Sequence, residues 1–173
     1  DTSIAVAGTH GKTTTTSMLS HILLKGECDP TISVGGILPA IGGNIRVGQS
    51  ETFLTEACEY TNSFLSFFPT LGIILNMDAD HLDFFKDIDD IRHSFRKFAE
   101  LLPADGALII NADTPKYKMV AENLPCKVIT YGLEHDAEYT ASDITYDEFG
   151  HPTFHVLHNG EDIGTCSLKV PGI

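Results

Sequence analysis

The sequence is poor in basic residues. Only 11 Lys and Arg residues stand against 24 Asp and Glu residues among 173, which gives a formal net charge of −13. Nonspecific nucleic-acid binding needs a basic surface that displaces counterions, so the composition argues against a nucleic-acid partner. An anionic ligand would instead have to be held by local groups, such as backbone amides at a helix N-terminus, one lysine or bound divalent cations.

Long apolar runs and paired cysteines are also missing. No run of eighteen apolar residues occurs, and the N-terminus lacks the pattern of a signal peptide, so we expect a cytoplasmic protein with no membrane partner. The cysteines lie too far apart for a zinc site or a disulfide scaffold, and we expect them to be reduced and structural. They are Cys28, Cys58, Cys126 and Cys166.

Short apolar runs alternate with helical patterns along most of the chain. This alternation predicts one α/β domain, similar to P-loop NTPases, with a mostly parallel sheet flanked by helices. The predicted strands are residues 3–7, 31–34, 51–57, 71–75, 107–110 and 127–131, and the predicted helices are 12–25, 88–102 and 115–123. Residues 139–169 alternate apolar and polar side chains, which predicts a small antiparallel hairpin region near the C-terminus.

Two segments have distinctive boundaries. Residues 35–48 are rich in glycine and are predicted to form a long loop that faces a substrate. The helix over 88–102 has apolar residues at helical spacing, with Asp87 placed to cap its start and Pro103 to end it.

The segment Ala7–Thr16 reads Ala-Gly-Thr-His-Gly-Lys-Thr-Thr-Thr-Thr at a predicted strand-to-helix junction. Free N–H groups at the positive end of a helix dipole bind phosphate oxygens. Gly8 and Gly11 let the backbone approach the ligand, Lys12 can reach the β and γ phosphates, and Thr13 offers a hydroxyl to magnesium. The predicted nucleotide site is Gly8, Thr9, His10, Gly11, Lys12, Thr13 and Thr14.

Two alternatives remain open for this loop. The first glycine of the usual P-loop pattern would fall at Val6, so the loop is either a shorter variant or a simple glycine turn that begins a helix. His10 could orient a phosphate or a substrate carboxylate, or it could be an exposed loop residue.

Polar residues follow two predicted strands at what would be the same sheet edge as the loop. Glu56 follows one strand, and the segment Asn76–His81 follows another. Magnesium prefers oxygen ligands, so Thr13 and Glu56 suit one ion, although Glu56 could equally be a solvated carboxylate. Glu59 is a weaker alternative to Glu56. His81, taken alone, is better explained as a structural residue, and the histidines at 151, 155 and 158 are predicted to be exposed and not to bind metal.

The ordered set Ala7–Thr16, Glu56-Ala-Cys-Glu59, Asn76-x-x-x-Asp-His81-Leu-Asp83 and Val170-Pro-Gly172 resembles the Mur ligase family over essentially the whole chain. The resemblance is greatest to the branch that adds L-alanine to UDP-N-acetylmuramate. It implies an ATP-dependent ligase of peptidoglycan precursor synthesis, in which an acyl phosphate forms and is attacked by the amino group. It also implies that Lys12 contacts the phosphates, that Thr13 and Glu56 hold one Mg²⁺, and that His81 helps to hold a second and takes part in catalysis.

The resemblance also sets expectations about what this chain lacks. Residues 1–173 would be the central ATP-binding domain, without the N-terminal UDP-sugar domain and the C-terminal domain that receives the amino acid. Several family members carry a carbamylated lysine where Phe95 stands here. The alternatives are a recycling ligase that adds a tripeptide to UDP-N-acetylmuramate, a P-loop nucleotide switch without ligase chemistry, and a metal-dependent interaction domain.

Overall fold

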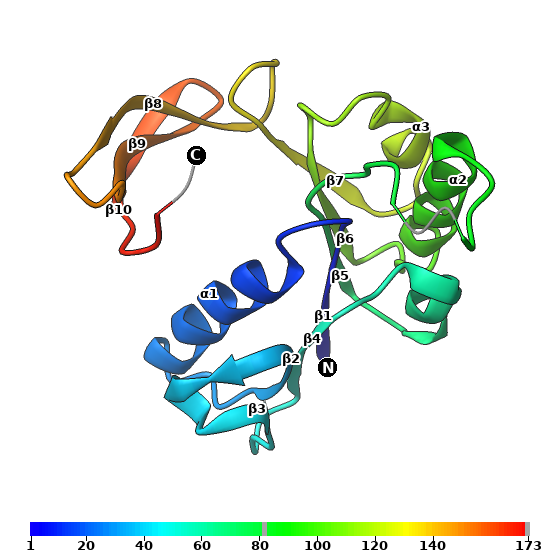
Figure 1. The fold of residues 1–173 in the computed structure, drawn as a ribbon, viewed down its shortest axis with the longest axis horizontal. Helices are drawn as coiled ribbons and strands as arrows, with labels where there is room; N and C mark the ends of the chain where they lie inside the picture. The colour runs from blue at the N-terminus through cyan, green and yellow to red at the C-terminus, as the bar shows by residue number, and fades with distance from the viewer. Residues whose placement is uncertain (81–82, 172–173) are drawn as a thin grey trace.

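The computed structural model describes residues 1–80 and 83–171. Within them a single sheet of ten strands has helices on both of its faces (Figure 1). Helix α1 (Lys12–Lys25) covers one face, and α2 (Ile88–Ala99) and α3 (Lys118–Ala121) cover the other. Both ends of the sheet curve toward α1, which therefore lies on the concave side.

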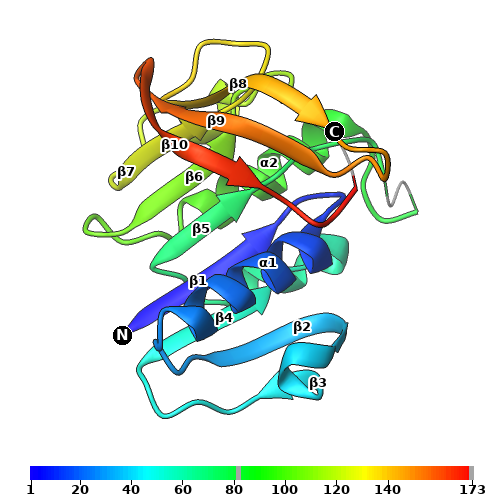
Figure 2. The same cartoon turned by 90° about the vertical axis from the view of Figure 1, so that its left-hand side faces the viewer.

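The strand order is β10-β9-β8-β7-β6-β5-β1-β4-β2-β3 (Figure 2). Strands β1, β2, β4, β5, β6 and β7 pair in parallel, and β8 joins β7 in parallel at Tyr131 and Tyr139. Strand β3 pairs antiparallel with β2, and β8, β9 and β10 pair antiparallel with one another. The strands are β1 (Thr2–Ala7), β2 (Thr31–Leu38), β3 (Gly43–Arg46), β4 (Thr52–Glu56), β5 (Leu71–Ile74), β6 (Ala107–Asn111), β7 (Lys127–Tyr131), β8 (Tyr139–Tyr146), β9 (Pro152–His158) and β10 (Glu161–Ser167). The predicted parallel α/β sheet with C-terminal hairpins is confirmed.

The predicted loop over residues 35–48 is wrong. Strand β2 continues through Gly35 and Gly36, a 3₁₀ turn follows at Pro39–Ile41, and the chain returns as β3. The glycines of this segment favour a loop, but the hairpin needs a tight reversal only at Gly42, whose φ is 69°.

Helix boundaries differ from the prediction in two places. Asp87 does cap α2, because its carboxylate accepts hydrogen bonds from the N–H groups of Asp89 and Asp90. The helix ends at Ala99, before the predicted end at 102. The predicted helix over 115–123 shrinks to the single turn of α3, and a 3₁₀ segment, η2 (Tyr60–Ser66), was not predicted.

The main core lies between the sheet and α2. Phe64 of η2 stacks on Phe98 with ring centroids 5.0 Å apart, and Phe95 packs edge-on at 5.4 Å. All three rings are fully buried. Phe95 is therefore a packing residue. A smaller cluster of Ile4, Val6, Leu54 and Ile73 packs under α1.

Candidate functional site

The loop between β1 and α1 ends at the middle of the sheet. Strand β1 lies between β4 and β5, so the loop emerges at the point where the strand order of the parallel sheet reverses. Ligands of open α/β sheets bind in the crevice at this point. Gly8 has φ 144° and Gly11 has φ 83°, conformations that side-chain-bearing residues rarely adopt. Gly11 begins α1 without a side-chain cap, and the first turn carries no acidic residue. The positive end of the helix dipole therefore faces the loop, and no acidic side chain of the first turn neutralises it.

Asn76, after the end of β5, forms two hydrogen bonds with the backbone of this loop. Its side-chain oxygen accepts from the N–H of His10 at 2.8 Å, and its amide donates to the carbonyl of His10 at 3.0 Å. Beside it, the N–H of Asp78 donates to the hydroxyl of Thr9 at 2.9 Å. The loop and the segment after β5 are thereby held together, as the shared sheet edge predicted.

Thr13 and Glu56 lie in contact at the start of α1. The Thr13 hydroxyl donates to Oε2 of Glu56 at 3.1 Å, and the N–H of Gly35 donates to Oε1 of the same carboxylate at 2.5 Å. Strand β2 approaches so closely that a Cβ on Gly35 would lie 2.8 Å from Oε2. A hydroxyl and a carboxylate held together are the oxygen donors that Mg²⁺ prefers, so these residues fit a magnesium site.

Lys12 makes three hydrogen bonds inside the protein. Its ammonium donates to the carbonyls of Gly8 at 2.5 Å and Thr9 at 3.3 Å, and to Oε2 of Glu59 at 3.0 Å. The Lys12 side chain is 15% exposed and that of Glu59 only 2%. The sequence pattern made Glu59 only a second choice as a metal ligand. In the structure Glu59 contacts Lys12, and Glu56 contacts Thr13, the next residue of α1.

The remaining predicted residues fall into two groups. His10, Thr13 and Thr14 are exposed at the loop and the first turn of α1, whereas Gly8 and Thr9 are buried. His81 lies outside the described residues, so its predicted part in metal binding and catalysis stays a prediction. Among residues 1–80 and 83–171, no group of three or more His, Cys, Asp and Glu side chains is arranged to hold a metal ion. Thr13 and Glu56 would leave the other ligand positions to phosphate or water.

Asp113 organises the next strand ends along this edge and was not predicted. Its carboxylate accepts from the backbone N–H groups of Leu133, Glu134 and His135 and contacts the His135 ring at 3.0 Å. Burial opposes ionisation, but these donors hold the pKa of Asp113 below its usual range. A signal was present in the sequence: the Asn-x-Asp pattern of Asn76–Asp78 after β5 recurs at Asn111–Asp113, which begins at the last residue of β6.

A cavity of about 560 Å³ lies between α1 and the β8–β10 hairpins, and it touches the loop region through Thr14. Met18, Ile144 and Phe154 contribute to its largely apolar wall. Burial, with a smaller effect of Asp113, raises the pKa of Tyr131 at this cavity to about 12. The phenol therefore stays neutral at physiological pH.

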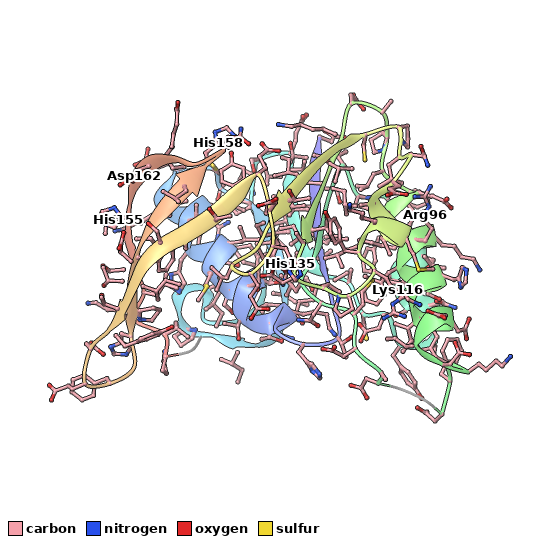
Figure 3. All side chains as sticks on the ribbon, turned by 90° about the horizontal axis from the view of Figure 1, so that it is seen from above. Arg96, Lys116, His135, His155, His158 and Asp162 are labelled. Atoms are coloured by element: carbon pink, nitrogen blue, oxygen red, sulfur yellow. The ribbon has the colours of Figure 1, made fainter. Side chains whose placement is uncertain are left out.

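The three hairpin histidines are partly exposed, and each contacts a carboxylate. His151 lies 2.9 Å from Asp147, His155 lies 2.7 Å from Asp162, and His158 lies 3.2 Å from Glu138. In Figure 3, His155, His158 and Asp162 lie at the opposite end of the molecule from Arg96 and Lys116. The cysteines are free, but Cys28 and Cys58 are exposed, so only Cys126 is a buried structural residue.

A strand, a glycine-containing loop and a helix with an uncapped N-terminus form an α/β domain of the P-loop type. A helix N-terminus in this arrangement is suited to bind phosphate, and a lysine and a hydroxyl–carboxylate pair lie beside it. The Mur ligase middle domain family matches residues 6–173, so the chain belongs to the Mur ligase family. None of the described helices is long and apolar enough to cross a membrane.

Similar proteins agree with this membership. The UDP-N-acetylmuramate–L-alanine ligase of Lachnospira eligens is 61% identical over 98% of this chain, and that of Agathobacter rectalis is 56% identical over 99%. The chain spans 37% and 38% of these relatives. The crystal structure of the UDP-N-acetylmuramate-alanine ligase of Thermotoga maritima has a TM-score of 0.84 at 28% identity, over 99% of this chain and 37% of that one.

A second solved structure comes from another branch. The UDP-N-acetylmuramate:L-alanyl-gamma-D-glutamyl-meso-diaminopimelate ligase of Neisseria meningitides has a TM-score of 0.86 at 27% identity. The match covers 98% of this chain and 56% of that one. Both branches therefore share this fold.

Proposed function

We propose that residues 1–173 are the central ATP-binding domain of a longer ligase that joins L-alanine to UDP-N-acetylmuramate. The observation that carries the proposal is the contact of Thr13 with Glu56, 3.1 Å apart, beside the uncapped start of α1. The identities of 56% and 61% to L-alanine ligases favour this branch over the tripeptide-adding branch. In this proposal the UDP-sugar domain and the amino-acid domain of the ligase lie outside residues 1–173.

Each residue of the site has a separate role in binding the triphosphate of ATP. The backbone N–H groups from Gly8 to Thr14 cradle the phosphates, and His10, exposed at the rim of the loop, contacts a phosphate or the substrate carboxylate. Lys12 neutralises charge at the β and γ phosphates. Thr13 and Glu56 hold one Mg²⁺, which when bound offsets the phosphate charge, and His81 contributes to a second ion.

The reaction follows from phosphoryl transfer to a carboxylate. The γ-phosphoryl group of ATP moves to the carboxylate of UDP-N-acetylmuramate and ADP leaves. The amino group of L-alanine then attacks the acyl phosphate, forming the amide and releasing phosphate. Phosphoryl transfer depends mainly on positioning and charge stabilisation, which is what a lysine, fixed amides and metal ligands supply.

Substrate-dependent ADP release from the full-length protein tests this function. We expect release to require both UDP-N-acetylmuramate and L-alanine, with amide product in equal amount. Release that requires the tripeptide L-alanyl-γ-D-glutamyl-meso-diaminopimelate instead of L-alanine would assign the protein to the recycling branch. ATP hydrolysis at the same rate without either substrate would indicate a nucleotide switch and contradict a ligase.

A further inference from the structure

Glu59 has no part in the chemistry described above, yet it is among the most buried charged residues of the protein. It follows β4 by three positions and begins η2, and the N–H of Asn62 donates to its carbonyl at 2.9 Å. Its side chain is 2% exposed and lies 3.0 Å from the Lys12 ammonium. A buried carboxylate carries a desolvation cost that such a partner must offset.

The ammonium of Lys12 already uses its full set of donors. It has three N–H bonds, and the structure gives it three acceptors, namely the carbonyls of Gly8 and Thr9 and the carboxylate of Glu59. A nucleotide phosphate can therefore accept a hydrogen bond from Lys12 only by replacing one of these partners.

Glu59 is the partner that a phosphate would replace. The Gly8 and Thr9 carbonyls belong to the loop that leads directly into Lys12, whereas Glu59 comes from the separate segment after β4. The Lys12–Glu59 bond is also the one between full opposite charges, and a phosphate offers the same charge-assisted bond. Anionic phosphate and anionic carboxylate compete for one cation, and each disfavours the other nearby.

We propose that Glu59 is a positioning residue that holds Lys12 against the loop until a nucleotide phosphate takes the place of its carboxylate. The inference rests on the proposed function, because it assumes that the loop binds ATP. It assigns different roles to two acids of one segment: Glu56 contacts Thr13 and Glu59 contacts Lys12, which are consecutive residues of α1. Glu59 thus sets how readily Lys12 becomes available to a phosphate.

The Glu59→Gln variant of the full-length protein tests this role. The amide keeps the size of the side chain but removes the charge that competes with phosphate, so nucleotide should bind more tightly. We expect the dissociation constants of ATP and ADP, measured by calorimetry in EDTA, to fall about tenfold, the change expected when one charge-assisted bond becomes neutral. Glu100→Gln, which removes a carboxylate from an ion pair with Arg96 on α2, is the matched control and should leave both constants unchanged.

Glu59→Asp keeps the proposal testable if the glutamine variant does not fold by circular dichroism. Its carboxylate is one methylene shorter and retreats from Lys12, so we expect tightening of about two- to threefold. Unchanged or weaker binding by a folded variant overturns the proposal, because a purely structural role predicts weaker binding. Weakening confined to the magnesium complex also overturns it, since that result would make Glu59 a metal ligand.

ATP binding by the wild-type protein distinguishes failure of the proposed function from failure of the role proposed for Glu59. Absence of ATP binding by the wild-type protein would refute the proposed function itself. Normal wild-type binding with no gain in the Glu59 variants would refute only the role of Glu59.

Discussion

Replacing Gly35 by alanine perturbs the predicted magnesium site without changing any of its ligands. The N–H of Gly35 donates to Oε1 of Glu56, and a Cβ at this position would lie 2.8 Å from Oε2 and 3.2 Å from the carboxyl carbon. Ordinary contacts begin at about 3.5 Å, so the carboxylate must move by more than half an ångström. That movement carries it out of its contact with the Thr13 hydroxyl.

The size of the effect follows from the geometry that magnesium demands. Mg²⁺ requires near-octahedral ligands at about 2.0–2.1 Å, so a displacement of half an ångström is a large fraction of the bond. We expect the Mg²⁺ concentration for half-maximal activity to rise about tenfold, which corresponds to ~1.4 kcal/mol of binding free energy. The end of the Glu56 side chain is flexible, so we expect the maximal rate at saturating Mg²⁺ to recover to within about threefold of wild type.

The assay is ADP release by the full-length protein, titrated with Mg²⁺ at constant ATP complexation. Gly43→Ala in β3 is the matched control, because a Cβ there meets no atom within 4 Å. An unchanged Mg²⁺ dependence in Gly35→Ala, with the control also unchanged, would refute the assignment of Glu56 as a metal ligand.

Three further predictions concern single side chains. Lys12→Ala should lower kcat/KM by at least about a hundredfold, roughly 3 kcal/mol, because a preorganised charge contact is lost; a near-normal rate would contradict its role. Asp87→Ala should lower the free energy of unfolding by about 1 kcal/mol in urea denaturation, because α2 loses its cap; an unchanged midpoint would show the cap to be dispensable. Asp113 has a lowered pKa in the folded protein, so its stabilisation is present above the unfolded-state pKa and is lost as pH falls through the folded pKa. Asp113→Asn should therefore be less stable than wild type at neutral pH, with a difference that shrinks on acidification, and a constant difference would contradict this account.

The sequence predicted those parts of the fold that local patterns determine. The strand before Gly8, helix α1 from Lys12 to Lys25 and the Asp87 cap follow from apolar periodicity and capping chemistry, and the structure agrees. The hairpin β2–β3 was missed because its pairing is tertiary: Ile32 pairs with Arg46 across fourteen residues, and the intervening glycines resemble a loop.

The sequence predicted which residues form the candidate site, but not all of the contacts between them. The shared sheet edge suggested that Thr13 and Glu56 would meet, and they do. No pattern indicated that Lys12 would turn toward Glu59, because a sequence does not record which of two nearby acids is buried. The cradle around Asp113 depends on three consecutive N–H groups turning inward, a backbone conformation that side-chain patterns do not specify.

Helix α1 begins at Lys12 after the N-cap Gly11, with no side-chain cap and no acidic residue in its first turn. A bound polyphosphate would accept hydrogen bonds from the free N–H groups of the first turn of α1. Nucleotide binding would therefore stabilise this end of the helix. Nucleotide at a hundred times its dissociation constant would add about 2.7 kcal/mol to the stability of the native state. The melting temperature of the protein is therefore a direct gauge of nucleotide occupancy, and it can be read before any acyl acceptor is supplied.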